Sequence, residues 1–331
     1  MALDVKVTIE LSKPIGKAGT WFPCLYTVDS TAESDSYKEY KKLEDMVTDY
    51  AATTDAYKAA SLLFMQDNAP DKIAVLKQSA FSTSTMAAYL NKGWRQLVLC
   101  GTHSNIKDIA AYIETTDKML FFTAADTTTD TTFWADATKK YDRTFVVVHK
   151  QEDENAAAAV VGATAGLKAG SFTYKNMVIK GVTASDYTDA NLDTIHAAGG
   201  VAIVEKAGDI VTSEGVVRSG EYADIIDSKD YIIQNIAQKT QKVFNNNKKV
   251  PYTDAGIGML EVATLEALVD GYNNGMIADN ADGTPAYSTS FALRSQTSEA
   301  ERAERKYPYG VFSFVLAGAI HEATIKGTIS V

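Results

Sequence analysis

The chain of 331 residues is poor in the residue types that build metal and redox sites: it has two cysteines and four histidines. Cys24 and Cys100 lie far apart and lack the C-x-x-C spacing of a metal or redox pair. We interpret both as buried thiols in strands, the default for a cytosolic product. No two histidines are four residues apart, so a zinc site would need ligands from distant segments. We therefore expect no metal and no other cofactor.

An excess of positive charge and a long apolar run are also missing. The 32 Lys and Arg residues against 42 Asp and Glu residues give a net charge of −10, and the basic residues form no obvious stripe. Both facts argue against a nucleic-acid partner. No apolar run approaches the roughly 20 residues that span a bilayer, and the first residues lack the basic segment and apolar core of a signal peptide. We expect no membrane insertion, and synthesis and assembly in the cytoplasm.

The sequence motifs of phosphate binding and nucleophilic catalysis are absent too. No G-x-G-x-x-G follows a predicted strand, and neither G-x-x-x-x-G-K-[ST] nor G-x-S-x-G occurs. An enzyme site would have to lie in the loops after the strands, at residues 101–104, 123–126 and 149–152, where His103, Asp126 and His149 are the candidate groups. A cytosolic α/β enzyme acting on a small molecule is therefore the alternative hypothesis.

What the sequence does contain, over residues 21–205, is an alternation of short apolar runs with amphipathic stretches. The apolar runs, each typical of a strand, are Trp21–Val28, Ile73–Lys77, Gln96–Cys100, Met119–Thr123, Thr144–His149, Met177–Lys180 and Val201–Glu205. Helical spacing of apolar residues lies between them, over 37–50 and 106–113. Leu97–Leu99 and Phe145–Val148 are continuously apolar, as in strands buried on both faces. These features predict an outer three-layer α/β domain with a mainly parallel sheet over residues 21–205.

Residues 206–331 have a different pattern. Two long amphipathic helices are predicted, the first ending in the cluster Asn245–Asn247 and the second running from the N-cap Thr253 to Gly275. Val311–Leu316 and Ile320–Val331 are expected to form a closing hairpin around Ala317-Gly318-Ala319. The charged run Glu299–Lys306, which lies between the second helix and this hairpin, is interpreted as a solvated surface.

Both ends of the chain alternate strictly between apolar and polar residues. The apolar positions are Val5, Val7, Ile9 and Leu11 at the start and Ala323, Ile325, Ile329 and Val331 at the finish. A period of two gives each strand one apolar face and one polar face, and such a strand must add to a sheet. Either the two ends pair with each other inside one domain, or they are arms that add to the sheets of neighbouring subunits. In the organisation that we predict, residues 1–20 are an arm and linker that join residues 206–331 in an inner α+β domain built from both termini.

Three segments of this second half carry a family resemblance. Tyr222–Asp227, Val250–Ile257 and the closing signature resemble tail sheath proteins of contractile phage tails and phage-tail-like particles. The signature residues are Arg302, Arg305, Lys306, Gly318, Ala319, Ile320 and His321. The resemblance covers residues 220–331 by motif and the rest by architecture.

The resemblance implies a structural protein and not an enzyme. It implies a subunit that polymerises helically around an inner tail tube and contracts to drive the tube through the bacterial envelope. The implied partners are other copies of the chain, the inner tube protein, and the baseplate and tail terminator proteins. The implied location is a virion tail assembled in the host bacterial cytoplasm, with the terminal arms joining a hairpin of neighbouring subunits. A further alternative is another virion component, tube-like or capsid-associated.

A tube contact is expected on the polar face of the second long helix. Packing of its apolar stripe on the C-terminal sheet is predicted to leave Glu261, Glu266 and Asp270 pointing outward, where they suit a basic partner surface. The alternative is that these are solvated surface acids.

Overall fold

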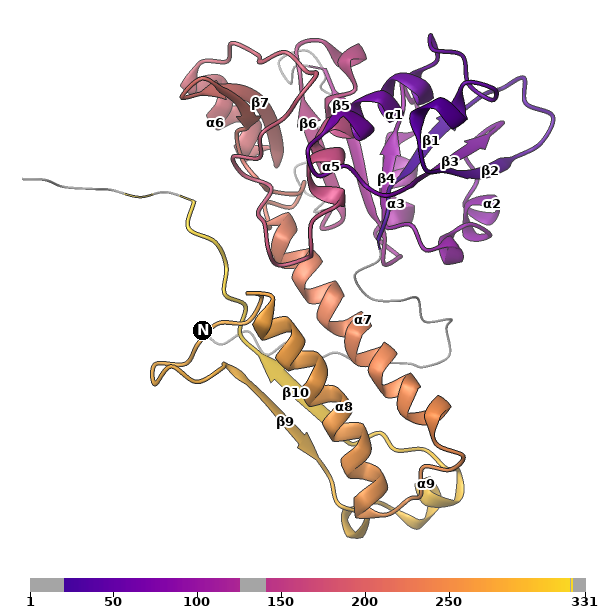
Figure 1. The fold of residues 1–331 in the computed structure, drawn as a ribbon, viewed down its shortest axis with the longest axis vertical. Helices are drawn as coiled ribbons and strands as arrows, with labels where there is room; N and C mark the ends of the chain where they lie inside the picture. The colour runs from indigo at the N-terminus through magenta and orange to yellow at the C-terminus, as the bar shows by residue number, and fades with distance from the viewer. Residues whose placement is uncertain (1–20, 126–140, 322, 324–331) are drawn as a thin grey trace, which may run out of the picture.

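The computed structural model describes residues 21–125, 141–321 and 323. They form an α/β part and an elongated part of helices and a β-ribbon, and one long helix runs through both (Figure 1). The α/β part holds an eight-stranded sheet in the order β2-β3-β1-β4-β5-β6-β7-β8. Its strands are β1 (Cys24–Val28), β2 (Ser36–Tyr40), β3 (Ile73–Gln78), β4 (Gln96–Leu99), β5 (Met119–Ala124), β6 (Thr144–Val148), β7 (Gly200–Lys206) and β8 (Asp209–Thr212). The six central strands are parallel, and the edge strands β2 and β8 are antiparallel to their neighbours.

Helices cover both faces of this sheet. The core on one face includes side chains of α1 (Asp55–Met65) and α5 (Ala156–Ala165), and the core on the other includes α2 (Thr83–Ala87), α3 (Ile106–Ile113) and α6 (Asp189–Ala197). Short 3-10 helices lie at η1 (Leu43–Met46), η2 (Leu90–Lys92), η3 (Glu152–Glu154) and η4 (Arg294–Gln296). The predicted three-layer arrangement with a mainly parallel sheet is confirmed.

The continuously apolar strands lie at the centre of the sheet, as predicted. In β6, Phe145 and Val147 enter one core while Val146 and Val148 enter the other, and all four are fully buried. The pleat sends successive side chains to opposite faces, and helices cover both, so both faces of residues 145–148 are apolar. The two cysteines are buried as expected, Cys24 in β1 and Cys100 directly after β4.

The helix predicted over residues 37–50 is wrong. Residues 36–40 form the edge strand β2, which pairs antiparallel with β3, and only η1 follows it. Tyr37 and Tyr40, three residues apart, lie on opposite faces of a strand and pack against different cores. The spacing of three that imitated a helix therefore comes from an edge strand that places an aromatic ring on each side of the sheet.

The strand predicted over Met177–Lys180 is not regular either. This segment runs beside β8, with Ile179 N–H donating to the Ile210 carbonyl at 2.8 Å, but only Val178 forms a bridge, to Val211. Asn176 before it and Gly181 after it both have positive φ, 58° and 77°. The left-handed backbone at both ends prevents a longer ladder.

The second part consists of two long helices and a β-ribbon. The elements are α7 (Ala223–Asn246), α8 (Asp254–Asn273), β9 (Tyr287–Phe291), α9 (Glu299–Ala303) and β10 (Gly310–Phe314). Both long helices were predicted, and Thr253 is the expected N-cap of α8, accepting a hydrogen bond from Gly256 N–H at 3.3 Å. A small core of its own lies between α7, α8 and the ribbon. Lys206 ends β7, and residues 209–212 belong to the same sheet as β8. The division of the chain into separate domains remains a prediction.

The predicted closing hairpin is corrected in part. The strand at residues 310–314 exists, but it pairs with β9, which lies before it in the sequence. Ile320, His321 and Ala323 have no regular secondary structure, and the remainder of the predicted last strand lies outside the described residues. The alternation of Tyr287, Thr289 and Phe291 with two serines was the signal for β9 that the sequence reading missed.

The N-terminus of α8 generates a stability prediction. A methyl group at Gly256 would lie 1.9 Å from the Pro251 carbonyl oxygen, whereas Gly258 on the same helix has open space around it. Gly256→Ala should therefore destabilise the protein by about 1–3 kcal/mol because the turn must shift. Gly258→Ala, the matched control, should be stabilising by up to about 1 kcal/mol, as expected for glycine in a helix. Equal midpoints for both variants in urea unfolding would contradict the role of Gly256.

Candidate assembly interface

The β9–β10 ribbon has open edges. Its two strands pair over five residues each, from Gly310 with Phe291 to Phe314 with Tyr287, and the part of the chain that the structure describes adds no third strand. One face of the ribbon packs toward α8, where Thr289 Oγ1 donates to Glu261 Oε1 at 2.9 Å. A two-stranded ribbon leaves unpaired N–H and C=O groups along both edges, and such edges accept further strands.

The two faces of the ribbon differ in chemistry. Phe312, Phe314 and Tyr287 belong to the core beneath α8. The outer face carries serine hydroxyls, with Ser288 and Ser313 hydrogen-bonded at 2.8 Å, together with Val311, which is 52% exposed. A strand added to either edge would have to continue this pattern, with apolar side chains toward α8 and polar ones outward.

The predicted arm residues lie mostly outside the described residues. This holds for Val5, Val7, Ile9 and Leu11, and for Ile325, Ile329 and Val331; Ala323 is described and is exposed. Pairing of the arms within the chain and pairing with neighbouring subunits both remain predictions.

The expectation that Glu261, Glu266 and Asp270 share one outward face of α8 is wrong. Glu261 accepts a hydrogen bond from the ribbon, whereas Lys239 of α7 lies 3.7 Å from Glu266 and 3.0 Å from Asp270. Positions 261 and 270 are nine residues apart, which on a helix of 3.6 residues per turn places them on opposite sides. Of these three acids only Glu266 is exposed, whereas Glu261 and Asp270 are half-buried.

The outward face of α8 is largely apolar instead. Its exposed residues recur at steps of four and three along one side of the helix: Ala255, Met259, Val262, Glu266, Val269 and Asn273. Met259, Val262 and Val269 are 38%, 53% and 39% exposed. A stripe of large apolar side chains on a helix whose opposite face already packs in a core is typical of a contact surface.

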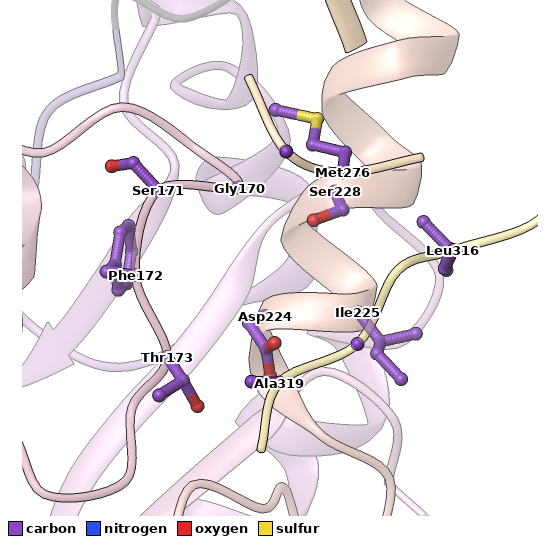
Figure 2. A pocket seen from close by; sticks show the side chains of 12 residues that line it. Gly170, Ser171, Phe172, Thr173, Asp224, Ile225, Ser228, Met276, Leu316 and Ala319 are labelled. Carbon is purple, nitrogen blue, oxygen red and sulfur yellow. The ribbon is translucent and has the colours of Figure 1, made fainter. Parts of the chain in front are cut away.

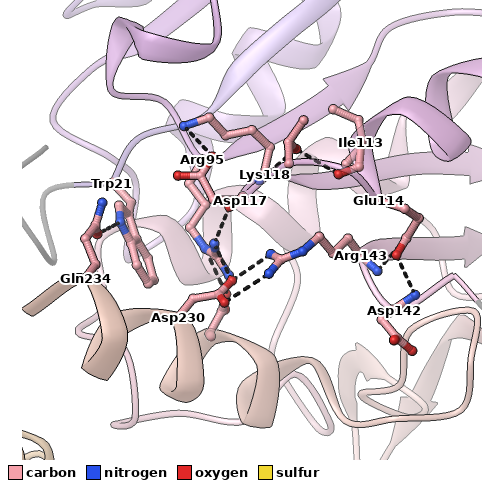
Figure 3. A network of polar contacts seen from close by, with 12 residues as sticks. Trp21, Arg95, Ile113, Glu114, Asp117, Lys118, Asp142, Arg143, Asp230 and Gln234 are labelled. Atoms are coloured by element: carbon pink, nitrogen blue, oxygen red, sulfur yellow. Dashed lines mark hydrogen bonds and ion pairs between the residues drawn. The ribbon is translucent and has the colours of Figure 1, made fainter. Parts of the chain in front are cut away.

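A buried charge network fixes α7 to the sheet (Figure 3). Arg95, immediately before β4, donates to Asp227 of α7 at 2.5 and 3.0 Å, and its guanidinium lies 2.9 Å from Asp230. Arg143, immediately before β6, binds Asp230 through two hydrogen bonds of 2.7 and 3.0 Å. Tyr174 OH donates to the second oxygen of Asp227 at 2.8 Å.

Trp21 completes this junction. Its ring lies 4.3 Å from the Arg95 guanidinium, and its Nε1–H donates to Gln234 of α7 at 2.8 Å. Arg95 and Asp227 are each 3% exposed. Burial alone would raise the pKa of Asp230, but the two guanidinium groups outweigh it and hold that pKa below its usual value. The network lies at the N-terminal ends of the parallel strands, opposite the edge where α/β enzymes place their sites.

A hollow lies on the other side of α7 (Figure 2). Its volume is about 310 Å³, and it is lined by residues 170–173, the first turns of α7, residues 275–276 and the segment 316–319. Asp224 faces it, and burial raises the pKa of this carboxyl. The wall formed by residues 316–319 is the start of the C-terminal segment.

The candidate enzyme loops do not form a reactive site among their described residues. His103 is buried, binds the Cys100 carbonyl through Nε2 at 3.1 Å and stacks on Tyr26. His149 is held between the Thr183 carbonyl and the backbone of Gln151, at 2.8 and 2.9–3.0 Å. Asp126 lies outside the described residues.

Within residues 21–125, 141–321 and 323, no group of three or more His, Cys, Asp or Glu side chains is placed to hold a metal ion. No helix in these ranges is long and apolar enough to cross a membrane.

The signature residues of the sequence lie in two places. Arg302 lies in the last turn of α9 and donates to the Thr297 carbonyl. Arg305 and Lys306 follow the helix, with Lys306 Nζ 2.9 Å from Glu304. Gly318 to His321 form the C-terminal segment. Sequence reasoning missed the junction residues; the available signal was a single arginine directly before each of two apolar strands and an Asp pair spaced i, i+3 on a helix.

Comparison with known proteins identifies the architecture. Residues 223–329 match the family model described as "E217 tail sheath protein gp31-like, C-terminal domain". A chain in the baseplate structure of the anti-feeding prophage superimposes with a TM-score of 0.73 at 12% identity, over 100% of this chain and 99% of that one. The chain has the tail sheath fold.

Two further sheath structures support this. A contracted sheath complex of the extracellular contractile injection system PVC gives a TM-score of 0.71 at 11% identity, covering 100% of this chain and 98% of that one. A sheath tail protein of Listeria innocua gives 0.60 at 9% identity, covering 92% and 97%. No curated protein sequence matches the chain. These tail sheath matches are to structural proteins and not to enzymes.

The junction leads to a second stability prediction. Asp227→Ala removes the carboxylate that accepts two hydrogen bonds from the Arg95 guanidinium, which is 3% exposed. Breaking a buried ion pair costs about 3–5 kcal/mol, and we expect the lower end of that range because Asp230 stays 2.9 Å from the guanidinium. The control is Asp186→Ala, which breaks the exposed ion pair with Lys150 and should cost at most about 1 kcal/mol. Chemical unfolding of both variants measures the difference; similar losses would show that the junction contributes little.

Proposed function

We propose that the protein is a structural tail sheath subunit that polymerises helically around an inner tail tube. The observation that carries the proposal is the open-edged β9–β10 ribbon, in a chain whose whole length has the tail sheath fold. Its partners would be other copies of itself, the inner tube protein, and the baseplate and tail terminator proteins. It would belong to a phage tail or tail-like particle assembled in the host bacterial cytoplasm.

Attachment between subunits would use the alternating ends of the chain. Each end has one apolar and one polar face, and the ribbon has a similar division, with aromatic rings toward α8 and mainly serines, beside Val311, outward. An arm strand that adds to the ribbon would bury its apolar residues beside the aromatic rings and pair its backbone with the free edge. Residues 1–20 and 206–331 would then form an inner domain built from both termini, with residues 21–205 outside.

Contraction would follow from a change in subunit contacts. The mesh of added strands would stay connected while each subunit moves outward, and the free energy would come from contacts that are more extensive in the contracted state. Assembly onto the tube would trap the extended state. Nothing in this mechanism requires a catalytic residue, and the backbone-bound His103 and His149 give the enzyme alternative no support.

The outward face of α8 is the proposed contact with the tube. Met259, Val262 and Val269 present apolar surface, with the carboxylate of Glu266 among them. This revises the all-acidic contact expected from the sequence, because Glu261 and Asp270 are used inside the subunit.

Removal of the arms tests the assembly proposal. Deletion of residues 1–12 or of residues 322–331 should abolish polymerisation, because the ribbon edges then lack the strands that link subunits. The circular dichroism spectrum and the unfolding transition of the α/β part should stay as in the parent, since neither deletion removes a residue of the eight-stranded sheet. Polymers of normal length by negative-stain electron microscopy from either deletion would rule out strand addition.

The tube contact has its own test. Val262→Asp places a charge in the middle of the α8 stripe and should reduce coating of purified tubes by at least about tenfold, because the buried contact would contain an unpaired carboxylate. Val47→Asp is the matched control: Val47 is 57% exposed, against 53% for Val262, and lies in the α/β part. Co-sedimentation with tubes measures both. Equal coating by the two variants would remove α8 from the tube interface.

A further inference from the structure

The C-terminal segment is held to the subunit at two separated points. The first is backbone pairing at its start, where Ala317 N–H donates to the Met276 carbonyl at 2.9 Å and Leu316 bridges to Ile277. The second is His321. Between them the segment packs poorly: Gly318 and Ala319 are exposed, Ile320 is 91% exposed, and the hollow of about 310 Å³ lies beneath residues 316–319.

His321 inserts into a socket formed by three segments of the chain. Its Nε2 lies 2.9 Å from Thr173 Oγ1, and its Nδ1 lies 3.5 Å from Glu214 Oε1. The Tyr222 ring meets the imidazole edge to face, with centroids 4.7 Å apart. The His321 side chain is only 11% exposed, whereas Ile320, the residue directly before it, is 91% exposed.

The socket is ordered by contacts that do not involve His321. Glu214 is bound to Lys175 at 2.8 Å and accepts from Gly215 N–H at 3.1 Å. The chain next to Thr173 is fixed because Tyr174 donates to Asp227 at 2.8 Å and its carbonyl accepts from Thr212 Oγ1 at 2.5 Å. A site that is formed in advance binds its ligand with a smaller entropic cost.

We propose that Thr173, Glu214 and Tyr222 form a catch for His321, and that this catch determines the point from which the C-terminal arm reaches toward a neighbouring subunit. The inference rests on the proposed sheath function. His321 is a positioning residue in this scheme, because it contacts its own subunit and acts on assembly through the arm.

The catch limits the volume that the arm can search. An extended chain advances about 3.3 Å per residue, so a ten-residue arm that begins after His321 could reach at most about 33 Å from it. If the catch opens, the last fixed point becomes Ala317, and four more residues add about 13 Å. A shorter tether with a fixed origin raises the effective concentration of the arm at one neighbouring ribbon and lowers it at others.

The first measurement follows the position of Ala323 in the unassembled full-length chain. Nitroxide labels on Ala323→Cys and Glu205→Cys report the distance between the arm base and β7; Cys24 and Cys100 are buried. The parent and Ile320→Ala should give one narrow distance distribution, since Ile320 is almost fully exposed. His321→Ala should broaden it at least about twofold. An unchanged distribution in His321→Ala would overturn the catch.

The second measurement is assembly of the same variants without labels. His321→Ala should give fewer and less regular polymers, by about fivefold or more in polymer mass, whereas Ile320→Ala should assemble as the parent does. His321→Gln, whose amide can still bond to Thr173, should restore most of the polymer. Thr173→Val removes only the hydroxyl and should have an intermediate effect.

The outcomes separate this inference from the assembly proposal. If the arm deletion abolishes polymers while His321→Ala assembles normally despite a broadened distribution, the sheath proposal stands and the positioning role is wrong. If the arm deletion itself leaves polymers intact, the proposal that subunits attach by strand addition is wrong, independently of the role of His321. Failure of His321→Gln to restore assembly while it restores the narrow distribution would also contradict the positioning role.

Discussion

The arrangement of the two parts depends on the charge network between α7 and the sheet. Arg95 and Arg143 project from the starts of two parallel strands and meet Asp227 and Asp230, one turn apart on the helix. The first turns of α7 pack in the sheet core through Ala223 and Ile226, and its later turns pack in the ribbon core through Ile232 and Ile236. One continuous helix thus belongs to both cores, and the buried ion pairs fix its direction. A hydrophobic contact would bind the helix as well, but it would not set its rotation as specifically.

This constraint has a consequence for the assembly surfaces. The ribbon edges and the outward face of α8 lie alongside the part of α7 that extends away from the sheet (Figure 1), so their position relative to the sheet follows from the helix. The core beneath the ribbon is small compared with the two cores of the sheet. A two-stranded ribbon on a small core gains more from added strands than a complete sheet does. The least complete part of the subunit is therefore the part on which the proposed polymer contacts fall.

Local pattern predicted most of the sheet and little of the junction. Strands such as β6 are apolar on both faces because helices cover both, and that pattern is visible in the sequence. Tyr37 and Tyr40 led to a wrong helix prediction, because an edge strand with an aromatic ring on each face can have the residue spacing of a helix. The strand β9 was missed because Ser288 and Ser290 face away from the core and only three residues face it. Arg95 and Asp227 are 132 residues apart, and no periodicity connects them. The prediction that Glu261 and Asp270 both point outward from α8 was wrong for a simpler reason. Positions nine residues apart on an α-helix lie half a turn from each other, on opposite sides.

The proposed attachment through backbone edges would also account for the low sequence identity between this chain and proteins of the same fold. The chain keeps the tail sheath fold at 9–12% identity to the solved sheath structures, while its C-terminal third still matches a sheath family model. Strand addition takes its affinity from main-chain hydrogen bonds, and side chains need only keep the alternation of apolar and polar residues. Such an interface tolerates almost any apolar residue at an inward position. Side-chain identity matters more where a residue is held by close contacts, as Gly256 is at the start of α8 beside the Pro251 carbonyl and His321 is in its socket, and both lie in the matched region.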